Sequence, residues 1–448
     1  MTDEALRELL HDLGEDQPPV VIPADTYRRG RRAHRRRVAA ATAACLAVAG
    51  AASAVPFLDL NGPDRVPPAG SAPAPAMPDR LYAVPERLTS FTAGPSGWRW
   101  HEDVAAPDLA IGTTAAVFPV DGGAVVAVSA RDGSYAGLDL PGFDEHAYFR
   151  FEDTAVALSP DGERLAWTWN RDVIGGAARR DAPSGVRLAD LRTGEVTHVR
   201  IRGGYGVYAH GFSWSPDGRY LAYNLDVTTS PGGGVRGTRN FRMQRLDIRT
   251  GEVLDVAGLA RADHGPAVSD RGEVATVGNG RPASWHPDRS PRVRAFEGGI
   301  GEWTAAWGPD GRLATGSFDR GWFGVGTTGS RGLISRTAAD APSGSRVRAL
   351  GWAGGKALVA YAAEDGLRVA AVPTRGAGAG KVVVDVEPGD VLTTLSVATD
   401  LLTRPARELP EPDWPTDWAR VATWAGVGAA VLLALLVRWR RRGPATGP

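Results

Sequence analysis

The chain has 448 residues, of which 51 are basic and 51 are acidic, so its formal net charge is zero. Gly and Pro together make up 90 residues (57 and 33), which disfavours a helical bundle, while the 43% hydrophobic content excludes a wholly disordered chain. The only cysteine, Cys45, excludes an intrachain disulfide framework, a thiolate metal site within one chain and catalytic cysteine chemistry.

The first 37 residues combine a short amphipathic segment with a run of arginines. In residues 3–14 the leucines recur at helical spacing before a Gly, which predicts a small surface helix. Residues 28–37 then hold seven arginines. This leader resembles the front end of actinobacterial membrane proteins found near sigma factors, some of which are anti-sigma factors. A leader that only sets membrane topology is the alternative interpretation.

An uncharged run of 21 residues, 38–58, follows the arginines. A helix of this length reaches about 30 Å, enough to cross the hydrocarbon core of a bilayer. The run ends in Ala52-Ser53-Ala54, a small-x-small pattern typical of a signal-peptidase site. A retained transmembrane anchor is therefore predicted, with a cleaved signal peptide as the alternative.

The middle of the chain contains a repeated turn motif. Residues 155–167, 211–223 and 305–315 each place Pro-Asp-Gly between two apolar runs. In such a turn, Pro presets φ, the Asp side chain bonds to its own backbone and Gly adopts positive φ, so each copy predicts a β-hairpin. The Asp and Gly residues of the three turns are Asp161, Gly162, Asp217, Gly218, Asp310 and Gly311.

A second hairpin trails the first two copies, because Asp190–Val196 recurs as Asp247–Val253. One unit therefore has four strands. With three weaker copies of the turn added, the residue before each turn is 118, 158, 214, 268, 307 and 352, at spacings of 40, 56, 54, 39 and 45 residues. Four-stranded units of this period predict an all-β fold, the β-propeller.

Residues 81–403 resemble the WD-repeat and TolB-like propeller families through these Ser-Pro-Asp-Gly hairpins. The Trp-Asp and Gly-His dipeptides of true WD repeats are missing at the expected places, which favours the TolB-like branch. The resemblance implies a propeller and does not imply an activity.

Ring closure sets the number of blades. The apolar run 391–398 has the pattern of an innermost strand without a full blade behind it, and residues 81–91 could supply the missing outer strand. This pairing predicts a seventh blade built from both ends of the domain. Six blades with an added terminal strand is the alternative.

Two Pro-rich segments, 59–80 and 404–417, flank the propeller and are interpreted as linkers. A second apolar run, 421–437, lies between Trp418 and Trp439, the expected aromatic residues of two membrane interfaces, and four arginines occur within residues 438–442.

The positive-inside rule places both arginine clusters in the cytoplasm, because one precedes the first span and the other follows the second. The propeller is then extracytoplasmic, at the cytoplasmic membrane, and the lipid bilayer is a partner. The predicted segments are a cytoplasmic leader at 1–37, a span at 38–58, a linker at 59–80, the propeller at 81–403, a linker at 404–417, a span at 418–439 and a cytoplasmic tail at 440–448.

Residues 38–437 carry 39 basic and 44 acidic side chains, a net charge of −5. This balance argues against nucleic acid as a partner, since phosphate binding needs an excess of positive charge. No metal-binding or serine-hydrolase motif occurs, and no cofactor is predicted. Gly324-Val-Gly326-Thr-Thr-Gly329 matches a dinucleotide fingerprint, but its β-hairpin context favours a turn.

Two longer inter-strand segments, 170–185 and 227–240, are predicted to emerge on one face of the ring. They carry five arginines that form a candidate patch for an anionic envelope polymer or an acidic protein. A solvated variable loop is the alternative. The arginines are Arg171, Arg179, Arg180, Arg236 and Arg239.

Three functions follow as hypotheses. The leading one is a non-enzymatic scaffold that binds a protein or an envelope component. The second is a hydrolase that uses acidic residues around the central channel, and convergent carboxylates at the channel mouth would favour it. The third is transmembrane signalling to a cytoplasmic partner of the sigma-factor type through residues 1–37.

Overall fold

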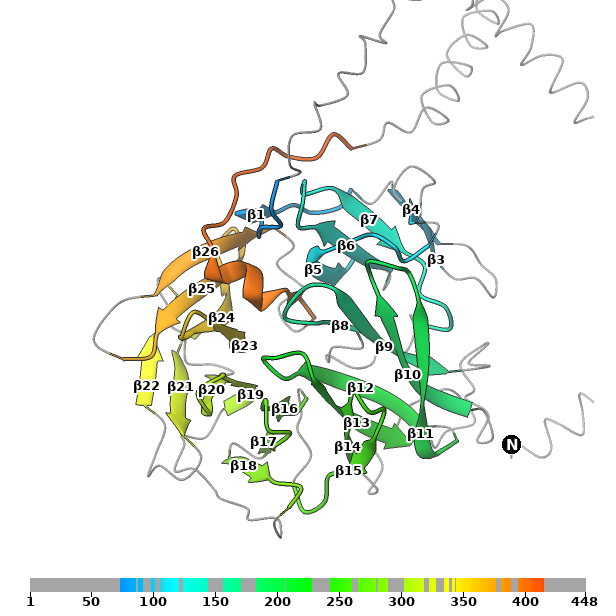
Figure 1. Ribbon diagram of the computed structural model, residues 1–448. Coiled ribbons are helices and arrows are strands. Elements are labelled where there is room, and N and C mark those ends of the chain that lie inside the picture. Colours follow the sequence, from blue (N-terminus) through cyan, green and yellow to red (C-terminus); the bar gives the residue numbers. More distant parts are fainter. Residues whose placement is uncertain are drawn as a thin grey trace, which may run out of the picture. The chain divides into compact units, whose positions relative to one another are not determined.

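A computed structural model gives the arrangement of the chain. It describes residues 73–414 with the following gaps: 86–87, 92–97, 101–104, 107, 121–123, 144–155, 171–182, 206, 228–241, 260–264, 279–280, 289–301, 318–321, 328–333, 338–340, 343, 376–379 and 388–393. These residues belong to one compact unit, 72–448. They form six β-sheets arranged as the blades of a ring, together with one separate hairpin (Figure 1).

Each blade starts at the ring centre and runs outward through antiparallel strands. Blade 1 contains β5 (Thr114–Pro119), β6 (Val125–Ser129) and β7 (Tyr135–Leu138). Blade 2 contains β8 (Val156–Leu158), β9 (Arg164–Asn170), β10 (Pro183–Asp190) and β11 (Val196–Tyr205). Blade 3 contains β12 (Val207–Trp214), β13 (Tyr220–Val227), β14 (Arg242–Asp247) and β15 (Val253–Asp255).

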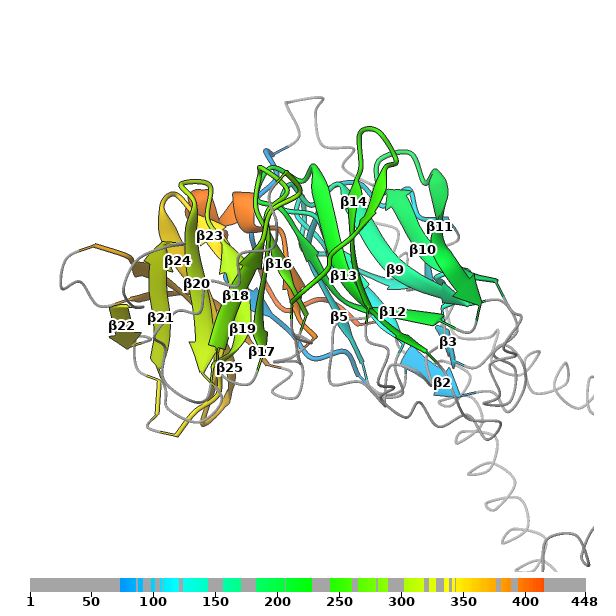
Figure 2. The same cartoon turned by 90° about the horizontal axis from the view of Figure 1, so that it is seen from below.

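The second half of the ring repeats this plan. Blade 4 shows three strands among the described residues: β16 (Ala267–Val268), β17 (Val274–Gly278) and β18 (Arg281–Trp285). Blade 5 contains β19 (Glu302–Trp307), β20 (Arg312–Ser317), β21 (Trp322–Thr327) and β22 (Ile334–Thr337). Blade 6 contains β23 (Val347–Ala353), β24 (Lys356–Ala363), β25 (Gly366–Pro373) and β26 (Lys381–Val386). In the edge-on view of Figure 2 the strands run between the two faces of the ring.

The all-β propeller prediction is confirmed, and each of the six numbered marker residues lies on the first strand of one blade. The turn glycines Gly162, Gly218 and Gly311 have φ values of 74°, 67° and 77°. This left-handed conformation strains any residue with a Cβ, which explains why Gly ends each turn.

The hydrophobic core is divided into clusters that lie between neighbouring blades. One joins blades 2 and 3 around Leu221 and Tyr223, and another joins blades 5 and 6 around Phe323 and Tyr361. The largest joins blades 6, 1 and 2. Each sheet therefore buries its faces only against the next sheet, and the ring must close for the core to be complete.

The seven-blade prediction is wrong, because the two ends of the domain join existing blades. β27 (Ser396–Val397) pairs antiparallel with β5 and becomes the innermost strand of blade 1. β1 (Arg80–Leu81) pairs parallel with β26 and becomes the outermost strand of blade 6. The ends thus close a six-bladed ring from opposite sides.

The segment 81–91, which was expected to complete a seventh blade, is divided between β1 and a separate hairpin. β2 (Thr89–Phe91) pairs with β3 (Trp98–Trp100) as a separate hairpin, and β4 (Ala105–Ala106) pairs parallel with β7 at the outer edge of blade 1. The short 3₁₀ helix η4 (Thr399–Thr403) follows β27.

No helix in the described part of the chain is long and apolar enough to cross a membrane. The predicted spans 38–58 and 418–439, with Trp418 and Trp439, and the leader 1–37 lie outside that part.

Candidate binding site in the central cavity

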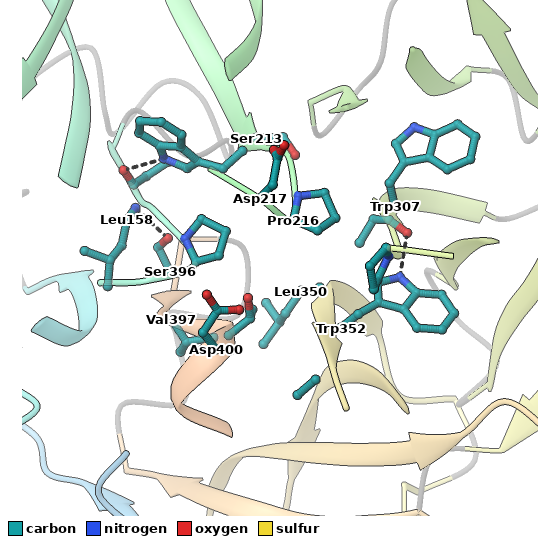
Figure 3. A pocket seen from close by; sticks show the side chains of 18 of the residues that line it. Leu158, Ser213, Pro216, Asp217, Trp307, Leu350, Trp352, Ser396, Val397 and Asp400 are labelled. Carbon is teal, nitrogen blue, oxygen red and sulfur yellow. Dashed lines mark hydrogen bonds between the residues drawn. The ribbon is translucent and has the colours of Figure 1, made fainter. Parts of the chain in front are cut away.

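A cavity of about 390 Å³ occupies the middle of the ring. Its wall is built by the first strands of blades 2, 3, 5 and 6, by the turns that follow the first strands of blades 2 to 6, and by β27 and η4. β5, the first strand of blade 1 in chain order, contributes no described lining residue, because β27 lies on its inner side. β27 and η4 thus form the wall of the cavity on the side of blade 1 (Figure 3).

One turn position recurs around the cavity. The second residue after each numbered marker lines the cavity in five blades, and we call it the rim position. It is Pro in blades 2, 3 and 5 and Gly in blade 6. Blade 4 departs from this pattern, because Asp270 stands where three of the other blades have Pro. The rim residues are Pro160, Pro216, Asp270, Pro309 and Gly354.

Three tryptophans lie on the wall beside these turns. The indole Nε1–H of Trp214 donates to the carbonyl oxygen of Ala157 in the preceding blade at 3.1 Å. Trp352 makes the equivalent bond to Ala306, also at 3.1 Å. The buried Nε1–H of Trp307 has no partner among the described residues. These bonds and the burial indicate a packing role between blades.

Carboxylates from three elements meet at one mouth of the cavity: Asp217 in the turn of blade 3, Asp270 in the turn of blade 4 and Asp400 in η4 (Figure 3 labels the first and the last). The backbone N–H of Asp217 donates to Oδ1 of Asp270 at 2.8 Å, which links two blades. The backbone N–H of Asp400 donates to the carbonyl oxygen of Pro160 at 3.0 Å and so fixes η4 on blade 2.

Burial and like charge shift the titration of two of these groups. Partial burial raises the pKa of Asp270, and the nearby Asp217 and Asp400 raise it further. Partial burial also raises the pKa of Asp400, with a contribution from Asp161. Both shifts indicate carboxylates that lack a compensating cation.

The one basic side chain among the described lining residues is Arg348, and its Nη1 donates to the carbonyl oxygen of Leu395 at 3.0 Å. Its charge leaves the lining with a formal excess of two negative charges. No three His, Cys, Asp or Glu side chains in the described ranges, the three carboxylates of the mouth included, are placed so that they could hold a metal ion.

A hydroxyl group completes the polar part of the wall. Thr399 is 8% exposed and lines the cavity, and its hydroxyl has no hydrogen-bond partner among the described residues. It is available to a ligand as a donor or acceptor. The neighbouring Ser396 is already used, because its Oγ accepts a 2.8 Å hydrogen bond from the backbone N–H of Leu158.

The turn residues predicted from sequence have separate roles. Asp161, Asp217 and Asp310 each accept a hydrogen bond from the backbone N–H two residues ahead, at 3.0 to 3.2 Å. Asp217 alone of these three lines the cavity. All three turns therefore use their Asp to hold the hairpin, and one of them also places its carboxylate at the mouth.

The five candidate arginines of the loop face lie outside the described residues. The strand ends from which their segments leave, Asn170 in β9 and Val227 in β13, lie at the opposite end of the sheets from the Pro-Asp-Gly turns, because each of these strands begins at such a turn. The strand ends that lead into these two segments therefore lie away from the turns that carry Asp217 and Asp270.

Sequence reasoning missed Asp270 and Asp400. A signal for Asp270 was present, since aligning Val268-Ser-Asp-Arg-Gly272 with Trp214-Ser-Pro-Asp-Gly218 puts Asp270 at a position of Pro. Asp400 had no such signal, because η4 reaches the mouth only through the pairing of β27 with β5.

The dinucleotide fingerprint falls on a strand. Gly324 and Gly326 belong to β21, and Gly324 pairs with Thr315 of β20 and with Ser335 of β22. Backbone groups committed to both neighbours cannot cradle a phosphate, so this match carries no cofactor site.

Comparisons with known proteins add no function. No protein-family model and no curated protein matches the chain. A chain of the mitotic checkpoint complex is 16% identical, covering 52% of this chain and 64% of its own, with a TM-score of 0.36.

TolB from Acinetobacter baumannii is 16% identical, covering 60% of this chain and 64% of its own, with a TM-score of 0.33. The Cps50 (Swd1) propeller domain of Myceliophteria thermophila is 15% identical, covering 52% and 71%, with a TM-score of 0.34. This chain spans less than two thirds of the checkpoint and TolB chains. Likeness at this level carries no argument about function, and the propeller assignment rests on the pairing of the strands.

Proposed function

We propose that this protein is a non-enzymatic binding scaffold, a six-bladed propeller held at the outer face of the cytoplasmic membrane by spans at 38–58 and 418–439. Both termini lie in the cytoplasm, and the ring binds a protein or a cell-envelope component. The observation that carries the anchoring is the direct connection between the incoming and outgoing segments of the ring.

The two segments are hydrogen-bonded to each other. Pro78 and Arg407 form a parallel bridge, in which the N–H of Asp79 donates to the carbonyl oxygen of Arg407 at 2.9 Å and the N–H of Arg407 donates to that of Met77 at 2.8 Å. The Arg407 guanidinium also donates to the carbonyl oxygens of Ala74 and Arg131, both at 2.6 Å. The chain thus enters and leaves the ring at one place, an arrangement that suits a domain anchored at both ends of its chain to one membrane.

The outgoing segment continues along blade 1 to Trp414, whose ring contacts Tyr135 edge-on at 5.0 Å between centroids. The predicted interface residue Trp418 lies four positions after Trp414, a reach of at most about 14 Å in extended chain. The outer edges of blades 1 and 6 would then lie close to the membrane, and both faces of the ring would be open to partners.

Topology is tested by reporter fusions at each terminus combined with N-terminal sequencing of the mature protein. Cytoplasmic reporter activity at both ends and an intact N-terminus are expected. An exported terminus would contradict the two-span arrangement, and a mature protein starting after Ala54 would replace the first anchor by a cleaved signal peptide.

Scaffold function is tested by crosslinking in membranes. Replacing Arg171, Arg179, Arg180, Arg236 and Arg239 together is expected to remove crosslinked partners and retention on purified cell wall. Unchanged retention and an unchanged partner set would exclude the loop face as the binding surface.

A hydrolase is the second candidate, favoured by the carboxyl pair of Asp217 and Asp270 at the cavity mouth. A carboxyl group of raised pKa beside a second carboxyl group is an arrangement that general acid and base catalysis uses. Purified protein is assayed on chromogenic glycosides and esters. Turnover that Asp270→Asn abolishes without loss of folding would support a hydrolase, and absence of turnover on the whole panel would favour the scaffold.

A further inference from the structure

We infer that the acidic mouth of the central cavity binds the side chain of an arginine or lysine from a partner polypeptide. The inference rests on the proposed binding function and names the chemistry of its ligand. It concerns the mouth formed by Asp217, Asp270 and Asp400, at the end of the ring opposite the strand ends that lead into the arginine-containing segments.

The first argument is the break in the repeat at the rim position. Proline holds this position in three blades, where it shapes the turn and presents only an apolar ring to the cavity. In blade 4 the same position carries Asp270, half-buried and next to two other carboxylates. Placing a charge there is unfavourable unless a cation is supplied, and none of the described residues forms an ion pair with Asp270.

The second argument is the unmet bonding capacity of the wall. The carboxylate of Asp400 accepts no hydrogen bond and forms no ion pair among the described residues, and its backbone holds it in place through Pro160. The hydroxyl of Thr399, a residue more than nine-tenths buried, likewise has no hydrogen-bond partner among the described residues. A guanidinium or ammonium group offers several donors to such acceptors and replaces the missing positive charge.

The third argument is the apolar surface that lines the same cavity. Trp214, Trp307 and Trp352 and the rim prolines provide flat walls suited to the methylene stem of a long side chain. The volume of about 390 Å³ lies near the lower end of small-ligand pockets, which suits a single side chain better than a folded domain. The Nη1 of Arg348 donates to the carbonyl oxygen of Leu395, the residue just before β27, and is therefore not used for the carboxylates.

The exposure of the carboxylates favours a polypeptide as the source. Asp217 and Asp400 are exposed at the opening, and Asp270 is less exposed. The charge therefore faces outward, where the backbone of a partner would rest on the turns while one side chain enters. Free polyamines carry the same kind of cationic group. The experiment distinguishes them from a partner polypeptide by comparing spermidine with charged peptides.

The test uses the full chain, purified in detergent, and titrates it with acetylated and amidated Ala-Arg-Ala, Ala-Lys-Ala and Ala-citrulline-Ala, and with spermidine. Binding is measured by calorimetry and by tryptophan fluorescence. Citrulline keeps the shape of arginine without its charge, so the arginine peptide is expected to bind at least about tenfold more tightly than the citrulline peptide.

Variants identify the site. Asp270→Asn keeps the acceptor for the Asp217 N–H, and Asp400→Asn removes only a charge, so each is expected to weaken the arginine peptide at least about tenfold with an unchanged melting profile or a higher melting temperature. Asp310→Asn is the matched control, since Asp310 holds the same kind of turn without lining the cavity. It is expected to bind like wild type.

Equal binding of the arginine and citrulline peptides, or wild-type binding by both cavity variants, would overturn the inference. If spermidine bound more tightly than both charged peptides, the inference that the cation comes from a partner polypeptide would be wrong. These outcomes are independent of the topology experiment, so a failure of membrane anchoring and a failure of cation binding are distinguishable.

Discussion

At the scale of single residues, the same turn glycine has different surroundings in different blades. A Cβ on Gly162 would lie 2.2 Å from the carbonyl oxygen of Thr114 in blade 1, whereas a Cβ on Gly311 would meet nothing within 4 Å. Both glycines have positive φ, so both substitutions are strained, but only Gly162 also touches the neighbouring blade.

Gly311→Ala is therefore expected to cost about 1–2 kcal/mol, the penalty of the left-handed conformation alone. Gly162→Ala is expected to cost more, because the backbone of blade 1 must shift and the 2.8 Å hydrogen bond from the Thr114 N–H to the Gly162 carbonyl is disturbed. Urea unfolding of the two variants measures the difference, and equal losses would contradict it.

Asp270 provides a residue-scale prediction about pH. Its pKa is raised by burial and by the carboxylates around it, so the folded state binds a proton more tightly than the unfolded state. Stability attributable to this group is present at acidic pH and is lost as pH rises from about 4 through the raised pKa.

Asp270→Asn removes the ionisable group, so stability is no longer lost as pH rises, and its amide oxygen still accepts the hydrogen bond from the Asp217 N–H. We expect a higher melting temperature than wild type at pH 7, with a difference that shrinks as pH falls toward 4. A difference that is constant across this range would show that the charge is not its cause.

At the scale of elements, tryptophans pack between the first strands of neighbouring blades, but only some of them also form a hydrogen bond to the preceding blade. Trp352 on β23 donates to Ala306 on β19, while the indole N–H of Trp307 is buried without a partner among the described residues. Gly308 makes room for Trp352, since a Cβ there would lie 2.7 Å from the indole ring.

Replacing either tryptophan by phenylalanine removes the same volume, so the pair isolates the hydrogen bond. Trp352→Phe removes the indole hydrogen bond to the Ala306 carbonyl and is expected to cost about 1 kcal/mol more than Trp307→Phe, which removes a donor that has no partner among the described residues. Chemical denaturation checks the ranking. A larger loss for Trp307→Phe would mean that its N–H is satisfied in solution.

At the scale of the whole molecule, the ring is closed by contacts between residues far apart in sequence. Met77 and Leu81 from the incoming segment are fully buried in the cluster that also contains Leu395 and Leu401 from the C-terminal segment. Closing six sheets into a ring therefore depends on these two segments, which local sequence does not connect.

Met77→Ala and Leu81→Ala are each expected to lower the free energy of unfolding by about 2–5 kcal/mol. Unfolding should remain a single transition seen by circular dichroism and tryptophan fluorescence together, because every blade relies on the closed ring. Val196→Ala, at a position 38% exposed, is the control and is expected to change stability by less than about 0.5 kcal/mol. Early loss of blade 1 or 6 alone would contradict this coupling.

The sequence by itself determined the repeated unit, because a Pro-Asp-Gly turn is specified by the local conformations of three adjacent residues. Those residues predicted the hairpins, and the spacing of the turns predicted four-stranded blades at six marker positions. Asp217 was found in this way as a turn residue.

Only the tertiary structure decided how the ring closes and where its acidic mouth lies. The pairing of Ser396 with Val117 of β5 and of Leu81 with Val386 of β26 depends on edges that become neighbours only when the sheets pack in a circle. For the same reason Asp400, distant in sequence from every turn, meets Asp217 and Asp270 at one opening. The charge of the cavity mouth is thus a property of the closed ring, since no single repeat contains it.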